Sequence, residues 1–396
     1  MDRCFVTTPI YYVNGAPHLG HAHTSIMADI LNRIHRMRGT PTALSTGTDE
    51  HGQKNQEAAA AAGLEVQAYL DRQSAQFREQ ADAMNVGYDW FIRTSDPVHK
   101  AAVQEALRRV HAKGLIEKRE YTGLYCVGCE QFKKKTDLDE QGRCPDHQVA
   151  PVTQTETNYF FALGRFQEWL VAEIERRPDW IRPDAYRREV LQMLSGPLDD
   201  LCISRPKSRV SLGIELPFDP DFVTYVWFDA LLNYLTVIGW PDERYQEWWP
   251  GAVHLMAKDI VKTHCVYWPI MLKALDIEPP AGYRIHGYWV GEGNVKMSKS
   301  LGNVVDPAAL TARIGVDALR FYLARTMKGG DSQISDGLVL GVYNGELANN
   351  IGNLYSRTVK LAAKQFEGRV PSPDTLHADD AALCDEVVGM ARAALD

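Results

Sequence analysis

The sequence predicts an α/β protein in which a parallel sheet is interrupted by an insertion and followed by helices. Strand-like and helix-like segments alternate near both ends of residues 1–328, a segment rich in cysteine, lysine and turn residues separates them, and helical periodicity follows. Alternating strands and helices imply βαβ units, whose strands are parallel. We therefore predict two sheet-forming halves, at residues 1–114 and 214–328. The insertion between them covers residues 115–213, and a partial helical segment follows at 329–396.

The first βαβ unit lies at the N-terminus. Residues 4–8 are rich in β-branched and aromatic side chains, which predicts a strand. A turn rich in proline, asparagine and glycine follows over 9–20, and apolar residues then recur at helical spacing until Gly39. We predict a second strand over 42–46 and a polar loop over 47–52.

The second half returns to the same alternation. We predict a strand over 253–256, a helix over 260–275 and a second strand over 283–290. A loop is predicted over 291–303, followed by a helix that contains 317–324. From about residue 330 onward the pattern is helical without a strand signal, and the last helix is expected over 379–395.

Composition excludes some classes of protein. Hydrophobic residues make up 45% and charged residues 24% of the 396-residue chain, as in ordinary globular proteins. No apolar stretch approaches the length of a membrane span, and the N-terminus does not resemble a secretory signal, so we expect a cytoplasmic protein with no membrane partner. The net charge of -8 weakens the expectation of a nucleic-acid partner, although a local basic patch could still bind RNA.

Four residues between the first predicted strand and helix suggest a phosphate site. They are His18-Leu19-Gly20-His21. A helix N-terminus attracts phosphate through its unpaired N–H groups and dipole, and two imidazoles could stabilise charge in a transition state. Gly20 would let a flat base or ribose approach the backbone. Alternatively, the two histidines only cap the helix.

A second phosphate-binding pattern lies in the predicted loop 291–303. It reads Lys296-Met297-Ser298-Lys299-Ser300. Two lysines on a loop could hold a triphosphate and neutralise a pyrophosphate leaving group, although such a run is more often a solvated basic loop.

Three cysteines and a histidine in the insertion have metal-site spacing. Cys126 and Cys129 are separated by two residues, as are Cys144 and His147. Two such knuckles predict one structural zinc ion with four protein ligands. A disulfide is disfavoured in a cytosolic chain, and four protein ligands would leave no open position for catalysis.

The two phosphate-binding patterns, in this order and context, resemble the two signature sequences of class I aminoacyl-tRNA synthetases. Longer stretches resemble the methionine enzymes of that family, namely residues 8–14, 47–54, 225–231 and 349–354. The resemblance extends from residue 3 to about 365. It implies a Rossmann-like catalytic domain that binds ATP with Mg²⁺ between its halves, forms an aminoacyl-adenylate and transfers the amino acid to tRNA. It also implies zinc in the insertion, and we expect a monomer.

The resemblance also assigns the site residues. ATP would contact His18, Gly20, His21, Lys296, Ser298 and Lys299, and His18, His21, Lys296 and Lys299 would stabilise the transition state. Asp49 would bind the α-ammonium group of the amino acid. The remaining residues implied for the amino-acid pocket are Ile10, Tyr12, Trp227, Ala230, Leu231, Tyr234, Asp259, Ile260 and His264. A donor from Tyr234 or His264 near the sulfur would discriminate against aliphatic analogues.

The sequence departs from the family pattern at two places. Thr263 and Leu212 stand where the family usually has aromatic residues, which makes strict specificity for methionine less secure. The family's anticodon-reading bundle would begin near residue 340, and only residues 340–396 follow. Either the chain is a shortened form or it lacks an anticodon-binding domain. The alternatives are therefore a ligase that passes the amino acid to a small acceptor without tRNA and a non-enzymatic protein that binds tRNA or a partner.

Overall fold

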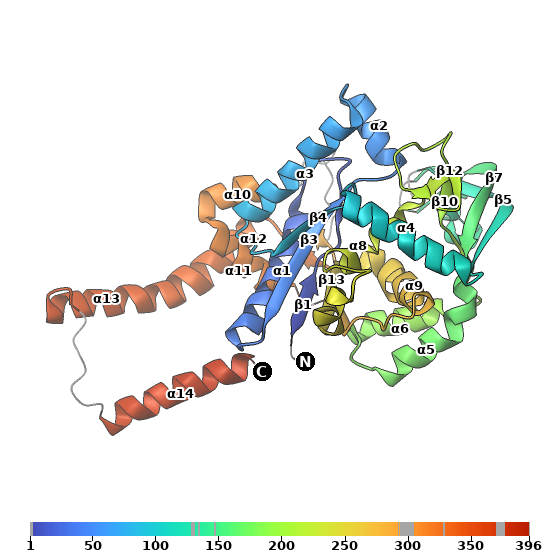
Figure 1. Ribbon diagram of the computed structural model, residues 1–396. Coiled ribbons are helices and arrows are strands. Elements are labelled where there is room, and N and C mark those ends of the chain that lie inside the picture. The colour runs from blue at the N-terminus through green and yellow to red at the C-terminus, as the bar shows by residue number, and fades with distance from the viewer. Residues whose placement is uncertain are drawn as a thin grey trace.

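The structure, a computed structural model, describes residues 3–127, 131–133, 135–145, 148–291, 293, 305–327, 329–369 and 377–395. It confirms the predicted α/β fold with a central parallel sheet (Figure 1). The strands of this sheet are β1 (Cys4–Thr7), β2 (Tyr11–Tyr12), β3 (Thr42–Asp49), β4 (Trp90–Arg93), β8 (Ile181–Arg182), β13 (Ala252–Ala257) and β14 (Gly282–His286).

The order of strands in this sheet has a switch point at its centre. The order is β2-β3-β1-β13-β14-β8, with β4 also paired to β3, and all of these pairs are parallel. The chain moves outward from β1 to β3 in the first half and from β13 to β14, in the opposite direction, in the second half. Ligands bind outside the carboxyl ends of the strands at such a point.

Helices cover both faces of the sheet, and others follow it in the chain. They are α1 (Leu19–Met37), α2 (Gln53–Ala61), α3 (Val66–Ala83), α4 (Pro97–Ala112), α5 (Gln167–Arg176), α6 (Asp184–Met193), α7 (Val226–Ala230), α8 (Asn233–Thr236), α9 (Trp268–Ala274), α10 (Pro307–Ile314), α11 (Val316–Thr326), α12 (Asp336–Val342), α13 (Asn353–Phe366) and α14 (Ala378–Leu395). In the view of Figure 1, α13 leads away from the sheet on the side opposite the insertion, and α14 runs back in the reverse direction.

Side chains of β1 alternate between the two faces, as expected for a strand. Val6 packs with Ile26 of α1 and Leu319 of α11 on one face. Phe5 belongs to a second cluster, with Trp268 of α9, on the other. The two halves of the chain therefore share both cores.

The predicted insertion forms one small sheet of its own and contributes a strand to a second, whose other two strands lie just beyond residue 213. One has the order β6-β5-β7-β9, formed by β5 (Ile116–Cys126), β6 (Gln131–Lys133), β7 (Val152–Phe161) and β9 (Leu201–Cys202). The other has the order β10-β12-β11, formed by β10 (Ser204–Pro206), β11 (Glu215–Leu216) and β12 (Asp219–Thr224). Because β8 pairs with β14 in the main sheet, these small sheets account for only part of the range 115–213.

Three local predictions differ from the structure. The polar loop 47–52 was wrong over its first three residues, because β3 continues to Asp49 through pairing with β4 and β2. The strand predicted over 283–290 is divided into β14 and β15 (Trp289–Val290), because the chain at Gly287 packs against the backbone of Gly330. The helical prediction beyond 330 missed β16 (Ser332–Gln333), a two-residue strand that pairs with β15. Pairings this short leave little signal in a sequence.

Gly47 offers a test of the pairing between β3 and β4. A Cβ atom at this position would lie 2.1 Å from the carbonyl oxygen of Ile92, which belongs to the backbone of β4. We expect Gly47→Ala to lower the free energy of unfolding by about 3 kcal/mol, because the strands must separate to accommodate the methyl group. Urea unfolding would measure this. Gly15→Ala is the control, since nothing lies within 4 Å of its Cβ position, and a loss in that variant as large as in Gly47→Ala would contradict the explanation.

Candidate active site

A cavity of about 300 Å³ opens at the carboxyl ends of β1, β3, β13 and β14. Thirteen of the residues implied by the family resemblance line it, namely Ile10, Tyr12, His18, Gly20, His21, Asp49, Trp227, Ala230, Leu231, Tyr234, Asp259, Ile260 and His264. They come from both halves of the chain. Lys296, Ser298 and Lys299 lie outside the described residues.

The turn before α1 fixes the protonation of two histidines. The Nδ1 atom of His18 accepts a hydrogen bond from the backbone N–H of Gly20 at 3.0 Å, and Nδ1 of His21 accepts from the N–H of His18 at 3.2 Å. A ring nitrogen that accepts carries no proton, so each neutral ring carries its proton on Nε2. Burial, with a smaller contribution from His18, lowers the pKa of His21 to about 3. His21 is therefore a neutral N–H donor at physiological pH.

These two histidines do cap α1, as the alternative interpretation supposed. His18 is the N-cap residue, and the two reciprocal hydrogen bonds form a capping box. The capping uses only Nδ1 of each ring. Because both rings also line the cavity, capping and contact with a phosphate are compatible.

The side-chain end of the cavity contains a directed hydrogen-bond chain. Nδ1 of His264 lies 3.0 Å from the carbonyl oxygen of Ile260, which can only accept, so this nitrogen carries the proton. In the neutral ring Nε2 then accepts from the hydroxyl of Tyr234, at 2.7 Å. Burial lowers the pKa of His264 to about 4, which keeps the ring neutral. Both groups are buried against the cavity wall.

The carboxylates of the cavity differ in exposure. Asp49 ends β3 and is 2% exposed, whereas Asp259 follows β13 and is exposed at the mouth. Burying a carboxylate is unfavourable unless a cation pairs with it. Asp49 is thus suited to an ammonium group that enters the cavity.

The two unusual positions lie behind the cavity wall. Thr263 is buried within a π-helical turn over Thr263–Tyr267, and Leu212 packs beside Tyr11 and Phe77 in a separate apolar cluster. Neither residue belongs to the cavity lining. The structure therefore gives no sign that these two substitutions alter the space available to a substrate.

Several lining residues were not predicted from the sequence. They include Tyr11, Thr24, His286, Tyr288 and Trp289. Thr24 lies 2.9 Å from Nε2 of His286, which joins α1 to the end of β14. Tyr11 lay within a stretch that resembled the family, but alternation along a strand would have placed it opposite Ile10 and Tyr12, away from the cavity.

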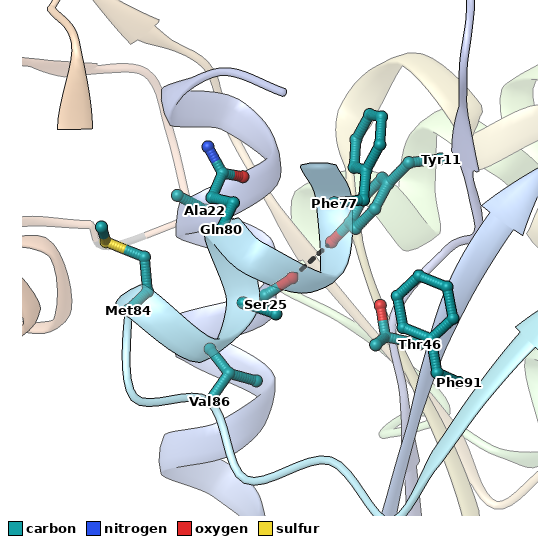
Figure 2. A pocket seen from close by; sticks show the side chains of 10 residues that line it. Tyr11, Ala22, Ser25, Thr46, Phe77, Gln80, Met84, Val86 and Phe91 are labelled. Atoms are coloured by element: carbon teal, nitrogen blue, oxygen red, sulfur yellow. Dashed lines mark hydrogen bonds between the residues drawn. The ribbon is translucent and has the colours of Figure 1, made fainter. Parts of the chain in front are cut away.

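Tyr11 also lines a second, small cavity of about 10 Å³ (Figure 2). Its hydroxyl lies 2.9 Å from Oγ of Ser25, and its ring stacks on Phe77. Burial raises the pKa of Tyr11 to about 12. Tyr11 thereby ties β2 to α1 directly behind the histidine turn.

The metal site predicted in the insertion is only partly described. Cys126 and Cys144 are both buried, while Cys129 and His147 lie outside the described residues. In the part of the insertion that the structure covers, no group of three potential ligands occurs. Cys126 pairs with Gln131, and the N–H of Cys144 donates to the carbonyl of Val149 at 2.9 Å, so each buried cysteine has a backbone partner five residues further along the chain. This repeated spacing suits two zinc knuckles.

Comparisons with known proteins agree on one family. The sequence profile described as tRNA synthetases class I (M) matches residues 4–150 and 147–359. The methionine–tRNA ligase of Fusobacterium nucleatum subsp. nucleatum is 42% identical over 391 residues, which are 98% of this chain and 60% of that protein. The methionine–tRNA ligase of Mycobacterium bovis is 43% identical over 390 residues, covering 97% of this chain and 75% of that protein. The chain thus spans less than two thirds of the Fusobacterium relative.

Solved structures give the same result. The Mycobacterium tuberculosis methionyl-tRNA synthetase in complex with methionyl-adenylate is similar, with a TM-score of 0.92 at 40% identity over 100% of this chain and 79% of that one. The apo form of the same enzyme gives a TM-score of 0.84.

Within the described part of this chain, every helix is too short or too polar to cross a membrane.

Proposed function

The chain belongs to the class I tRNA synthetases of the methionine type, and on this basis we propose that it activates methionine with ATP and transfers it to methionine tRNA. The observation that carries the proposal is the single cavity in which His18, His21 and Asp49 meet Trp227 and Tyr234. The relatives of 40–43% identity are methionine–tRNA ligases. The solved complex with methionyl-adenylate supports the same substrates.

In the proposed reaction, Asp49 holds the ammonium group and the aromatic wall holds the side chain. The methionine carboxylate attacks the α-phosphorus of ATP in line, a P–O bond to pyrophosphate breaks, and the new P–O bond gives the adenylate. His18 and His21 donate Nε2–H bonds to the phosphate oxygens as negative charge develops. Because Nδ1 of each ring accepts a backbone hydrogen bond, the donor that each ring offers to the phosphate is Nε2–H.

Lys296, Ser298 and Lys299 complete the proposed ATP site. The lysines would balance charge on the leaving pyrophosphate, and Mg²⁺ bound to ATP would neutralise the remaining phosphate oxygens. The 3′-terminal hydroxyl of tRNA then attacks the carbonyl carbon of the adenylate and releases AMP. Each of these steps relies on alignment and charge stabilisation, without a covalent enzyme intermediate.

The proposal extends to organisation and location. We assign 1–114 and 214–328 to the catalytic domain, 115–213 to the connective insertion, and 329–396 to the stem and the start of a helical bundle. We expect the protein to be a monomer, and we expect a cytoplasmic location because its proposed substrates occur there.

We also propose that Cys126, Cys129, Cys144 and His147 bind one structural zinc ion. Cys126→Ser should abolish zinc binding and make the segment 127–150 susceptible to proteases, because the ion joins two turns that lack a large core of their own. Elemental analysis and limited proteolysis would measure both effects. Cys384→Ser is the matched control, since Cys384 is exposed on α14. Full zinc content in Cys126→Ser would contradict the assignment.

Two assays test the proposed function. Methionine-dependent exchange of pyrophosphate into ATP is expected, and no exchange with any amino acid would overturn activation. A higher specificity constant for an amino acid other than methionine would overturn the substrate. Charging of methionine tRNA by the full-length protein is expected as well. Vigorous exchange without charging would favour the alternative, a ligase that passes the amino acid to a small acceptor.

A further inference from the structure

The turn that carries Asp49 is held from both sides by buried polar groups. Asp49, Glu50 and His51 are consecutive at the end of β3, and they are 2%, 0% and 2% exposed. Asp49 lines the cavity, Glu50 contacts Arg93, and His51 contacts Asp229. Three consecutive buried ionisable residues are costly unless each has partners, so their partners decide the conformation of this turn.

Glu50 is fixed to the neighbouring strand β4. Arg93 donates from Nε to Oε1 at 2.7 Å and from Nη2 to Oε2 at 3.1 Å, a two-point contact. The hydroxyls of Thr48 and Ser95 also donate to this carboxylate. The backbone N–H of Glu50 donates to Oγ1 of Thr94 at 2.9 Å. Glu50 can therefore not rotate without breaking several buried hydrogen bonds.

His51 is fixed to α7 through a fully buried carboxylate. Asp229 lies 2.5 Å from Nδ1 of His51 and 2.7 Å from Nε2 of His99. A carboxylate only accepts, so both nitrogens carry protons. Burial would raise the pKa of Asp229, but the charges and hydrogen bonds of the two histidines outweigh it and lower the pKa to about 2. Asp229 therefore remains ionised.

Asp229 lies on the short helix that forms the opposite wall of the cavity. Its neighbours Trp227 and Ala230 on α7 both line the cavity. On the other side, Asn55 donates from Nδ2 to the carbonyls of Asp49 and His51, at 3.1 and 3.2 Å. The contact between His51 and Asp229 thus joins the turn of Asp49 to the wall formed by α7.

We propose that His51 and Asp229 are positioning residues that set the spacing between the Asp49 carboxylate and the α7 wall of the amino-acid pocket. The inference rests on the proposed function, in which Asp49 meets the ammonium group and Trp227 meets the side chain of one small substrate. Both ends of such a substrate are satisfied together only at one spacing. A displacement of about 1 Å can cost about a hundredfold in an aligned site.

A pair of ligands separates positioning from general packing. Methionine and the analogue in which hydrogen replaces its amino group share the side chain and the carboxylate but differ at Asp49. We expect His51→Leu to raise the dissociation constant of methionine roughly 10- to 100-fold and that of the desamino analogue by less than about twofold. Tryptophan fluorescence provides the readout, since Trp227 lines the cavity.

Conservative variants and a control sharpen this experiment. His51→Asn should restore most of the methionine affinity, because its amide N–H occupies the place of Nδ1–H, whereas the longer side chain in His51→Gln should not. If His51→Leu does not fold, the comparison of His51→Asn with His51→Gln replaces it as the test. Asp71→Asn is the matched control, since Asp71 pairs with Arg93 at 2.7 Å but its side chain is 54% exposed, and we expect its affinities to be unchanged.

The outcomes distinguish the inference from the function on which it rests. If His51→Leu raised the dissociation constants of both ligands equally, His51 would not be a positioning residue. The same result in His51→Gln would count in the same way if that pair is used. Unchanged binding of methionine would also overturn the inference. In either case the unaltered chain would still bind methionine, and the proposed function would stand. Failure of the unaltered chain to bind methionine would overturn the proposed function and the inference with it.

Discussion

Replacing His18 by asparagine should lower the turnover number of methionine-dependent pyrophosphate exchange about 100- to 1000-fold, the usual cost of losing a preorganised donor to a transition state. Nδ1 of His18 caps α1, and the proposed catalytic donor is Nε2–H of the same ring. Asparagine is a preferred N-cap residue, so this variant removes the donor and retains the cap. The Michaelis constants for ATP and methionine should change little, because the lost interaction belongs to the transition state.

The control for this variant is its stability. The free energy of unfolding of His18→Asn should stay within about 0.5 kcal/mol of that of the unaltered chain, whereas His18→Ala should lose about 1 kcal/mol more because it also loses the cap. Urea unfolding and exchange kinetics on the same preparations would measure both. Undiminished turnover in a folded His18→Asn would show that this imidazole only caps the helix.

Acidification from pH 6.5 to 5 should unfold the protein. Burial is the largest cause that lowers the pKa of five histidines around the catalytic centre, His21, His23, His254, His264 and His286. Above pH 6.5 these groups are neutral in both the folded and the unfolded chain. Below pH 6.5 the unfolded chain binds protons that the folded chain does not, so stability falls as the pH falls.

The expected effect of acid is large. Each histidine whose pKa is far below 6.5 contributes up to about 1.4 kcal/mol per pH unit, so His21, His23, His254 and His264 together contribute up to roughly 5 kcal/mol per unit below pH 6, and His286 adds to the loss in the same direction. A typical domain has only about 5–15 kcal/mol of stability in total. Urea unfolding at pH 7.5, 6.5 and 5.5 would give the slope. A free energy of unfolding that does not change over this interval would contradict the prediction.

His23 offers a variant that isolates one of these protons. Its ring is fully buried between His286 and Trp289, and neither nitrogen has a hydrogen-bond partner among the described residues. His23→Phe preserves the aromatic contacts and removes the titrating group. Its stability should therefore fall less steeply with acid, by about 1.4 kcal/mol per pH unit.

The sequence was sufficient for the fold class and for part of the cavity lining, but not for lining residues such as Thr24 and His286. Strand and helix periods predicted the parallel sheet, and the resemblance to a family supplied residues such as Asp49 and His264, which the structure brings together. Strand pairings of only two or three residues could not be predicted from the sequence. The extension of β3 through Gly47 and Thr48 depends on β4, more than forty residues away, and Asp49 pairs with Tyr12 of β2, so the extension has no local signal.

The support beneath the site was also beyond sequence reasoning. His51 and Asp229 lay inside stretches that resembled the family, but their contact joins residues 178 positions apart. Periodicity says nothing about such a pair. Likewise, the sequence cannot tell the wall of a cavity from the layer behind it, and Thr263 and Leu212 lie in that layer.

Direct detection of methionyl-adenylate on the protein tests the central claim most simply. The unaltered chain would be mixed with methionine, ATP and Mg²⁺ in the presence of pyrophosphatase, quenched rapidly, and analysed by mass spectrometry. We predict that the adenylate accumulates in a burst stoichiometric with the protein, and that Asp49→Asn greatly reduces this burst at the same methionine concentration. Absence of the adenylate from the folded, unaltered chain would contradict the account.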